Sequence, residues 1–148
     1  MNASLNIILA EDDAQDKDFF VDALKRLGFS HNISWAKDHD ELFQSLSKNS
    51  SVDLVIIDLD MPGKNGKQSL REIKSHEQYH KLPVIIMTVS KNMGDVDEVY
   101  KEGAHYYAIK PYSQANYLET LKRVFDIDWK LPQPVPEKTQ FVINHAFV

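Results

Sequence analysis

Three short apolar runs in this chain end in charged residues whose types suit phosphoryl chemistry. The three sets are Glu11-Asp12 after Ile7–Ala10, Asp58 after Leu54–Ile57, and Lys110 after Tyr106–Ile109. Such runs are typical of buried parallel strands, whose carboxyl ends meet at the ligand-binding edge of an open sheet. Carboxylates and a lysine gathered at that edge would bind a divalent cation and a phosphoryl group.

The elements that would position these residues alternate between strand and helix patterns. The strand patterns are Ile7–Ala10, Ile33–Trp35, Val52–Asp58, Val84–Val89 and His105–Ile109. Each is followed by apolar residues at helical spacing; Asp13 is a candidate N-cap, Gly28 a helix-ending glycine, and a second helix starts at about Asp38. Five strands and five helices in strict alternation predict an α/β fold with a parallel sheet and right-handed crossovers.

Size and composition favour one domain with a short appendage. The chain has 148 residues, 43% of them hydrophobic, and a net charge of −5. This charge argues against nucleic-acid binding, which needs a basic face. The chain contains no cysteine, which excludes disulfides and thiolate metal sites. With no signal-like start and no apolar run of ~18 residues, we expect a cytoplasmic protein without membrane insertion.

The charged residues, in this order, resemble the motifs of a response-regulator receiver domain, the phosphoacceptor module of two-component signalling. The resemblance covers about residues 5 to 128. The motifs are Glu11-Asp12, Asp58 with Met61-Pro62 and a later glycine, Thr88 at the end of a strand, and Lys110-Pro111. The resemblance implies a flavodoxin-like (βα)5 doubly wound fold, with a five-stranded parallel sheet in the order 2-1-3-4-5.

The resemblance also implies how the site works. Asp58 would accept a phosphoryl group from the phosphohistidine of a sensor histidine kinase or a histidine phosphotransfer protein, and Lys110 and Thr88 would contact the phosphoryl oxygens. A magnesium ion, or manganese in its place, would complete the site. Its implied ligands are Glu11 through water, the carboxylates of Asp12 and Asp58, and the backbone carbonyl of Asp60.

The signalling step implied by the family is a change of surface. Thr88 would move toward the phosphoryl group and leave space that Tyr107 can enter, which would switch partner binding. The protein would therefore be a phosphoacceptor switch and not an enzyme, catalysing only its own phosphorylation and dephosphorylation. Because Val89 stands where a small residue is usual, we expect narrower access to Asp58. The bond before Pro111 is often cis in this family.

Two other functions stay open from the residues alone. A phosphorylation-independent adaptor with the receiver fold would explain Val89. The run Asp58-Leu59-Asp60-Met61-Pro62 also resembles the nucleophile motif of haloacid-dehalogenase phosphatases. That motif normally ends the first strand of a longer domain, which disfavours this alternative.

The composition changes at Trp129. We expect residues 1–128 to form the receiver and 129–148 a C-terminal extension, with a proline-rich extended segment and an apolar tail from Phe141, and no output domain. The acidic start and the Trp129 region are similar to stand-alone cyanobacterial phytochrome response regulators. The tail would pack on its own domain or mediate a homodimer.

Overall fold

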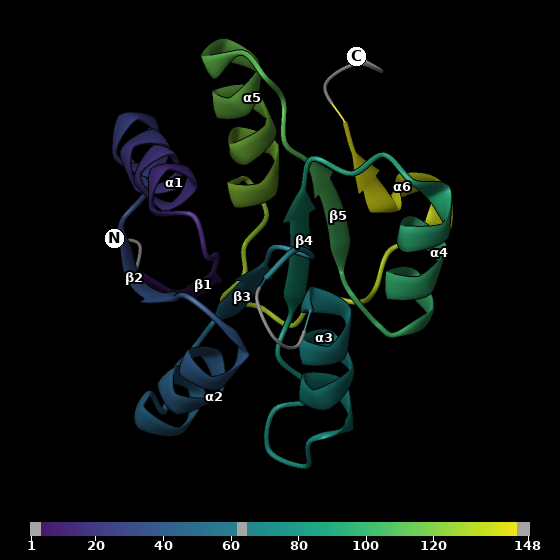
Figure 1. Cartoon of the computed structure of the whole chain (residues 1–148). Coiled ribbons are helices and arrows are strands. Elements are labelled where there is room, and N and C mark those ends of the chain that lie inside the picture. The colour runs from purple at the N-terminus through teal and green to yellow at the C-terminus, as the bar shows by residue number, and fades with distance from the viewer. Residues whose placement is uncertain (1–3, 62–64, 145–148) are drawn as a thin grey trace.

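Residues 4–61 and 65–144, which the computed structural model describes, form a parallel sheet with helices on both faces (Figure 1). The strands are β1 (Leu5–Ala10), β2 (His31–Ala36), β3 (Leu54–Ile57), β4 (Val84–Thr88), β5 (Tyr106–Ile109) and β6 (Val142–Ile143). The helices are α1 (Ala14–Leu27), α2 (His39–Lys48), α3 (Gly66–Ser75), α4 (Met93–Lys101), α5 (Gln114–Phe125) and α6 (Lys138–Phe141). None of the described helices is long and apolar enough to cross a membrane.

The helix ends follow local sequence signals. The Asp13 side chain caps α1 by accepting hydrogen bonds from the N–H groups of Gln15 and Asp16, and the Asp38 side chain caps α2 by accepting one from the N–H of Glu41. Gly28 ends α1 with a φ of 78°, a left-handed conformation that glycine adopts without steric cost. Each side-chain cap is worth about 1 kcal/mol. The expected cap and helix-ending glycine are therefore confirmed.

The sheet has the order β2-β1-β3-β4-β5-β6, and all neighbouring strands are parallel. The predicted order 2-1-3-4-5 is confirmed for the first five strands, but the predicted number of strands is wrong by one. The sixth strand pairs with β5, with Val142 opposite Tyr107 and Ile143 opposite Ala108. A strand of two residues carries no readable alternation, so only the long-range pairing reveals it.

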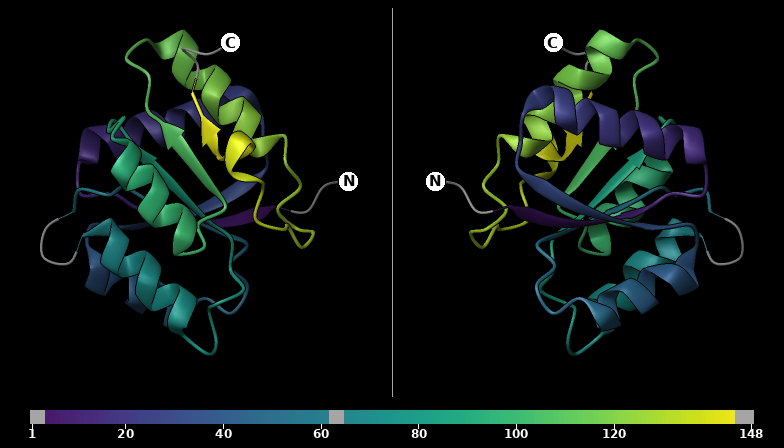
Figure 2. Two further views of the ribbon diagram at one scale, coloured as in Figure 1. Left: turned by 90° about the vertical axis from the view of Figure 1, so that its right-hand side faces the viewer. Right: turned by 90° about the vertical axis from the view of Figure 1, so that its left-hand side faces the viewer.

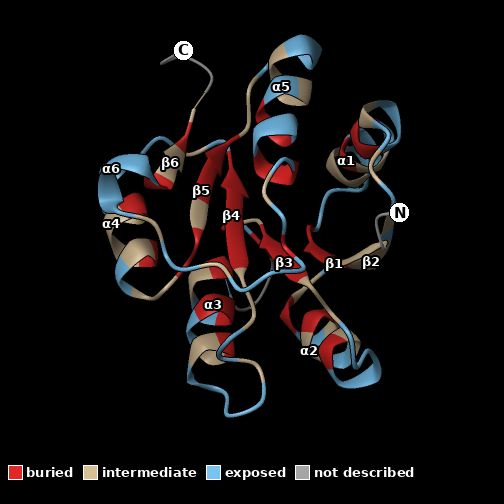
Figure 3. Ribbon diagram, turned by 180° about the vertical axis from the view of Figure 1, so that it is seen from behind, coloured by how far each residue is buried: buried red, intermediate tan, exposed pale blue. Residues whose placement is uncertain are grey.

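The two helical layers explain why the central strands β3 and β4 are buried along their whole length. Helices α1 and α5 cover one face of the sheet, and α2, α3 and α4 cover the other (Figure 2). In β3, Val55 and Ile57 face the second layer, whereas Leu54 and Ile56 face the first. All four side chains are fully buried (Figure 3). Burying each stabilises the fold by about 1.5–3 kcal/mol, which fixes the register of the central strand.

The chain after α5 runs along the outside of this fold and returns to the sheet. Trp129 is buried, and its indole N–H donates to a carbonyl of α5 at 2.9 Å. The His105 ring nitrogen Nε2 lies 3.0 Å from the Gln133 carbonyl, before the chain enters α6 and β6. The described part of the extension thus packs on its own domain. The last tail residues, 145–148, lie outside the described ranges.

Candidate functional site

Backbone hydrogen bonds between neighbouring strands continue one residue past three strand ends and hold the charged residues there. The amide N–H groups of these residues donate across the sheet edge to carbonyls of the adjacent strands. The bonds run from Glu11 to Ala36 (2.9 Å), from Asp58 to Ala10 (3.0 Å) and from Lys110 to Thr88 (2.8 Å). The side chains therefore leave a rigid edge, as expected from the sequence.

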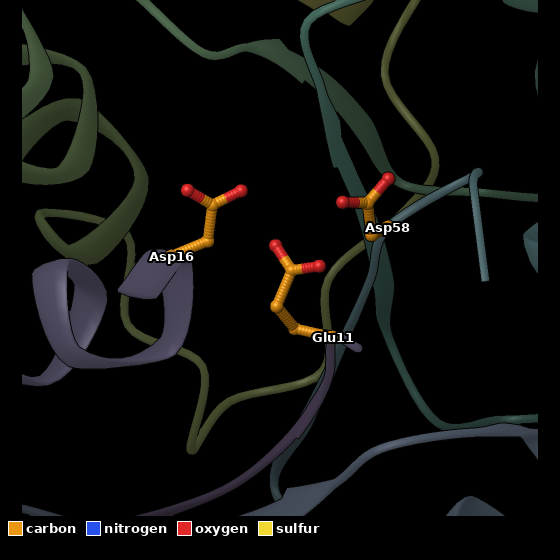
Figure 4. Close-up of side chains that lie close together, drawn as sticks. All are labelled: Glu11, Asp16 and Asp58. Atoms are coloured by element: carbon orange, nitrogen blue, oxygen red, sulfur yellow. The ribbon is translucent and has the colours of Figure 1, made fainter. Parts of the chain in front are cut away.

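Lys110 joins three carboxylates at this edge. Its Nζ lies 2.6 Å from Glu11 Oε1, 3.0 Å from Asp58 Oδ2 and 3.2 Å from Asp16 Oδ2. The acidic side chains converge from the end of β1, the end of β3 and the first turn of α1 (Figure 4). The side chains of Lys110 and Asp58 are only 12% and 13% exposed, so their charges are poorly screened by water.

The electrostatics of the cluster favour a further positive charge. Burial raises the pKa of Glu11 to about 8, and Asp58 adds to the rise while Lys110 opposes it. Burial disfavours the charged form of Lys110, but attraction to Asp58 and Glu11 outweighs it and raises the pKa of Lys110. The second oxygen of Glu11, Oε2, is buried without a hydrogen-bond partner.

The oxygen atoms present suit a divalent cation. One carboxylate oxygen from each of Glu11, Asp16 and Asp58 lies within 4.8 Å of the others. Mg²⁺ prefers hard oxygen ligands of this kind and tolerates waters in the remaining positions. Together with the partnerless Oε2 of Glu11, this set shows that the residues fit such an ion.

Two of the predicted metal ligands, Asp12 and Asp60, do not place a carboxylate in the group formed by Glu11, Asp16 and Asp58. Asp12 is exposed and does not belong to this carboxylate group among the described residues. Asp60 is also exposed, and its N–H donates to Asp58 Oδ1 at 3.0 Å, which orients the carboxylate. Pro62 of the motif lies outside the described ranges. The sequence interpretation missed Asp16, although its place in the first turn after the acidic pair was a usable signal.

Trp35 fixes the backbone beside the acidic cluster. Its indole N–H donates to the Glu11 carbonyl at 2.7 Å, so the ring supports the end of β1 from β2. The ammonium groups of Lys17 and Lys37 lie 4.6 Å and 5.2 Å from the ring centroid. Both distances suit a cation–π contact.

Gly66 permits a close approach behind Asp58. Its N–H donates to the Leu59 carbonyl at 2.9 Å, which brings the start of α3 against the turn after β3. A Cβ atom at this position would lie 2.4 Å from the Asp58 carbonyl oxygen. Because backbone atoms cannot move aside as a flexible side chain can, only glycine fits here without displacing the turn that carries Asp58.

Thr88 and Tyr107, the predicted switch residues, both bind Ser90. The Ser90 N–H donates to Thr88 Oγ1 at 3.4 Å, and the Tyr107 hydroxyl donates to the Ser90 carbonyl at 2.9 Å. The Ser90 hydroxyl donates to Asp95, whose carboxylate also pairs with Lys67. Tyr107 is fully buried. Ser90, which the sequence interpretation missed, is therefore the junction between the two residues.

A groove of about 430 Å³ opens beside Lys110 between α1 and α5. Its rim carries the exposed side chains of Phe19, Val89 and Tyr112. Val89 is 54% exposed, and its predicted effect on access to Asp58 stays a prediction. All described peptide bonds are trans, so the bond before Pro111 does not have the cis form that is often found in the family that the sequence resembles.

A serine, a histidine and a glutamate also meet between α2 and α3. His39 lies 2.7 Å from Ser69 Oγ through Nδ1 and 2.9 Å from Glu72 Oε2 through Nε2. The order of groups is that of a hydrolase triad, but the serine is fully buried. No substrate can reach this hydroxyl, so the contacts join the two helices and are not catalytic.

Comparisons with known proteins agree with this geometry. The family model described as the response regulator receiver domain matches residues 7–122. Chemotaxis protein CheY-3 of Vibrio cholerae serotype O1 is 28% identical over 126 residues, which cover 85% of this chain and 95% of that protein.

Two solved structures share the fold. The phosphorylated cyanobacterial phytochrome response regulator RcpA is 26% identical with a TM-score of 0.79, over 91% of this chain and 100% of that one. The Mn²⁺-bound response regulator Rcp1 is 22% identical with a TM-score of 0.76, over 90% of this chain and 99% of that one. At this identity, the second likeness concerns the fold alone.

Proposed function

The chain belongs to the response regulator receiver domain family, and we propose that within it Asp58 is the residue that accepts the phosphoryl group. Receiver domains are signalling switches that accept phosphoryl groups from histidine kinases or phosphotransfer proteins. The observation that carries the proposal is the contact of Lys110 Nζ with Asp58 Oδ2 at 3.0 Å, at the carboxyl edge of the sheet. Family membership excludes the haloacid-dehalogenase alternative.

The orientation of Asp58 suits attack on phosphorus. One carboxylate oxygen binds Lys110 and the other accepts the Asp60 N–H, so the side chain is fixed before the donor arrives. In the transfer, an Asp58 oxygen forms a bond to phosphorus while the bond from phosphorus to the donor histidine nitrogen breaks. Lys110 would then balance the charge on the phosphoryl oxygens, and the Thr88 hydroxyl would donate to one of them.

Mg²⁺, or Mn²⁺ in its place, is the cofactor that we propose for this site. Asp58 would bind it directly and Glu11 through water, with Asp16 as the neighbouring carboxylate. The carboxylate of Asp12 and the backbone carbonyl of Asp60 would complete the ligand set. When bound, the ion supplies positive charge against the developing charge on the phosphoryl oxygens. The buried, partnerless oxygen of Glu11 supports this assignment.

Phosphotransfer tests the function directly. The protein would be incubated with acetyl phosphate, and separately with a phosphorylated histidine kinase, with and without Mg²⁺, and its intact mass measured. We expect a Mg²⁺-dependent gain of one phosphoryl group that Asp58→Asn abolishes. Asp60→Asn is the matched control, because it removes a neighbouring carboxylate and keeps both Asp58 and the backbone carbonyl. No adduct from either donor would instead favour a phosphorylation-independent adaptor.

A further inference from the structure

The C-terminal extension places an aromatic ring against the buried tyrosine of the switch. Phe141, the last residue of α6, is fully buried. Its ring centroid lies 4.9 Å from that of Tyr100 on α4 in an edge-to-face arrangement, and 6.5 Å from that of Tyr107 on β5. The next residue, Val142, pairs with Tyr107 in the sheet. Side chain and backbone of the extension thus both engage the position that carries Tyr107.

Further contacts hold this segment on α4. The Tyr100 hydroxyl donates to the Pro136 carbonyl at 2.9 Å. Lys138 forms an ion pair with Asp97, also on α4. In the views of the fold, α6 and β6 lie beside α4 and β5 (Figures 1 and 2). The segment 137–143 therefore contacts both α4 and β5, the strand that carries Tyr107.

A continuous set of contacts leads from this segment to the phosphorylation edge. The Phe141 ring lies beside the Tyr107 ring, the Tyr107 hydroxyl donates to the Ser90 carbonyl, and the Ser90 N–H donates to Thr88 Oγ1. The Thr88 carbonyl accepts the N–H of Lys110. Each link is a direct contact, so a change in how Tyr107 packs changes the support of the loop that follows Thr88.

We propose that Phe141 is a positioning residue for phosphorylation: by keeping Tyr107 buried and bonded to Ser90, the docked segment 137–143 favours the state in which Asp58 is phosphorylated. This inference rests on the proposed function. The family resemblance implies that phosphorylation draws Tyr107 inward, which is the position that Phe141 also favours, so each would stabilise the effect of the other. Phosphorylation must therefore tighten the docking of the segment, and undocking must disfavour phosphorylation.

The first test uses the unmutated chain. Backbone hydrogen exchange of residues 137–143 would be measured with Mg²⁺ alone and with Mg²⁺ and acetyl phosphate, the phosphorylated fraction being followed by intact mass. We expect exchange at Val142 and Ile143 to slow about fivefold or more on phosphorylation, the lower end of ordinary coupling between sites. In Asp58→Asn, acetyl phosphate should leave the exchange unchanged.

The second test removes the ring. Phe141→Ala should slow phosphorylation by acetyl phosphate about fivefold or more, because less of the protein holds Tyr107 in the favoured position. Phe141→Leu should restore most of the rate, since it fills much of the space. Leu131→Ala is the matched control: it truncates an apolar side chain in the same extension that is 59% exposed.

The outcomes separate the two proposals. If the unmutated chain gains no phosphoryl group, the proposed function fails, and this inference fails with it. If the chain is phosphorylated but exchange at residues 137–143 does not change, the coupling is refuted while the function stands. If Phe141→Ala loses thermal stability yet is phosphorylated at the unmutated rate, Phe141 is structural only, and the inference is wrong.

Discussion

Replacing Lys110 by methionine removes the ammonium group that contacts Glu11, Asp16 and Asp58 and keeps a side chain of similar length. Removing one partner of a buried charge pair costs about 3–5 kcal/mol, because the other charge stays buried and unpaired. Without the ammonium group, the three carboxylates repel one another. Glu11 can relieve part of this repulsion by holding a proton, since burial raises its pKa to about 8. We therefore expect Lys110→Met to lower the free energy of unfolding by about 3 kcal/mol at neutral pH, the lower end of this range.

A loss of this size is measurable by thermal unfolding. For a chain of this length, 1 kcal/mol corresponds to about 2–4 °C, so Lys110→Met should lower the unfolding midpoint by about 6–12 °C without Mg²⁺. Adding Mg²⁺ should raise the midpoint of the variant more than that of the unmutated protein, because the ion replaces the missing positive charge.

The matched control is Lys122→Met, in which an exposed lysine paired with Asp126 is lost. Such surface pairs contribute about 0–1 kcal/mol, so this midpoint should scarcely change. Two results would refute the argument. One is an unaltered midpoint in Lys110→Met without Mg²⁺. The other is a smaller response of this variant to Mg²⁺ than that of the unmutated protein.

Two further perturbations test the surroundings of the site. Gly66→Ala should lower the free energy of unfolding in urea by about 2–3 kcal/mol and slow phosphorylation of Asp58, because the new Cβ would clash with the backbone carbonyl oxygen of Asp58. Gly94→Ala is the control, since its new Cβ would meet only a side chain. Equal stability of the two variants would contradict the steric reason. The ammonium of Lys74 donates to the Leu82 carbonyl, and burial lowers the pKa of this lysine to about 8. Between pH 8 and the ordinary pKa of a lysine, the unfolded chain therefore holds more protons than the folded chain. The free energy of unfolding must then rise with pH over this range. From pH 7 to 10 the free energy of unfolding of the unmutated protein, measured in urea, should rise by about 2–3 kcal/mol relative to that of Lys74→Met, and a constant difference would exclude a lowered pKa.

The elements of the sheet could be predicted because their signals are local. The apolar run Leu54–Ile57, the cap Asp13 and the glycine Gly28 each act through neighbours in the sequence, and the structure confirms all three. The proximity of Asp58 and Lys110 could also be predicted. Both directly follow strands whose ends must meet at one edge of a parallel sheet.

What could not be predicted depends on contacts between distant segments. Asp16 reaches Lys110 only because α1 packs against α5, the helix that follows β5 and Lys110 in the chain. Ser90 joins Thr88 and Tyr107 through backbone groups, for which its residue type gives no signal. The strand Val142–Ile143 exists only by pairing with β5. In each case the residue type permits the contact, and the tertiary fold decides it.

The balance of charge at the strand ends explains why a cation and a phosphoryl group would depend on each other here. Glu11, Asp16 and Asp58 face one ammonium group, that of Lys110, so the cluster is negative whenever its carboxylates are ionised. A phosphoryl group adds further negative charge at Asp58, which Lys110 alone cannot balance. A divalent cation offsets this excess in a poorly hydrated site, where each charge interacts strongly. The same cluster that resists phosphorylation without the ion should therefore accept it readily when the ion is bound.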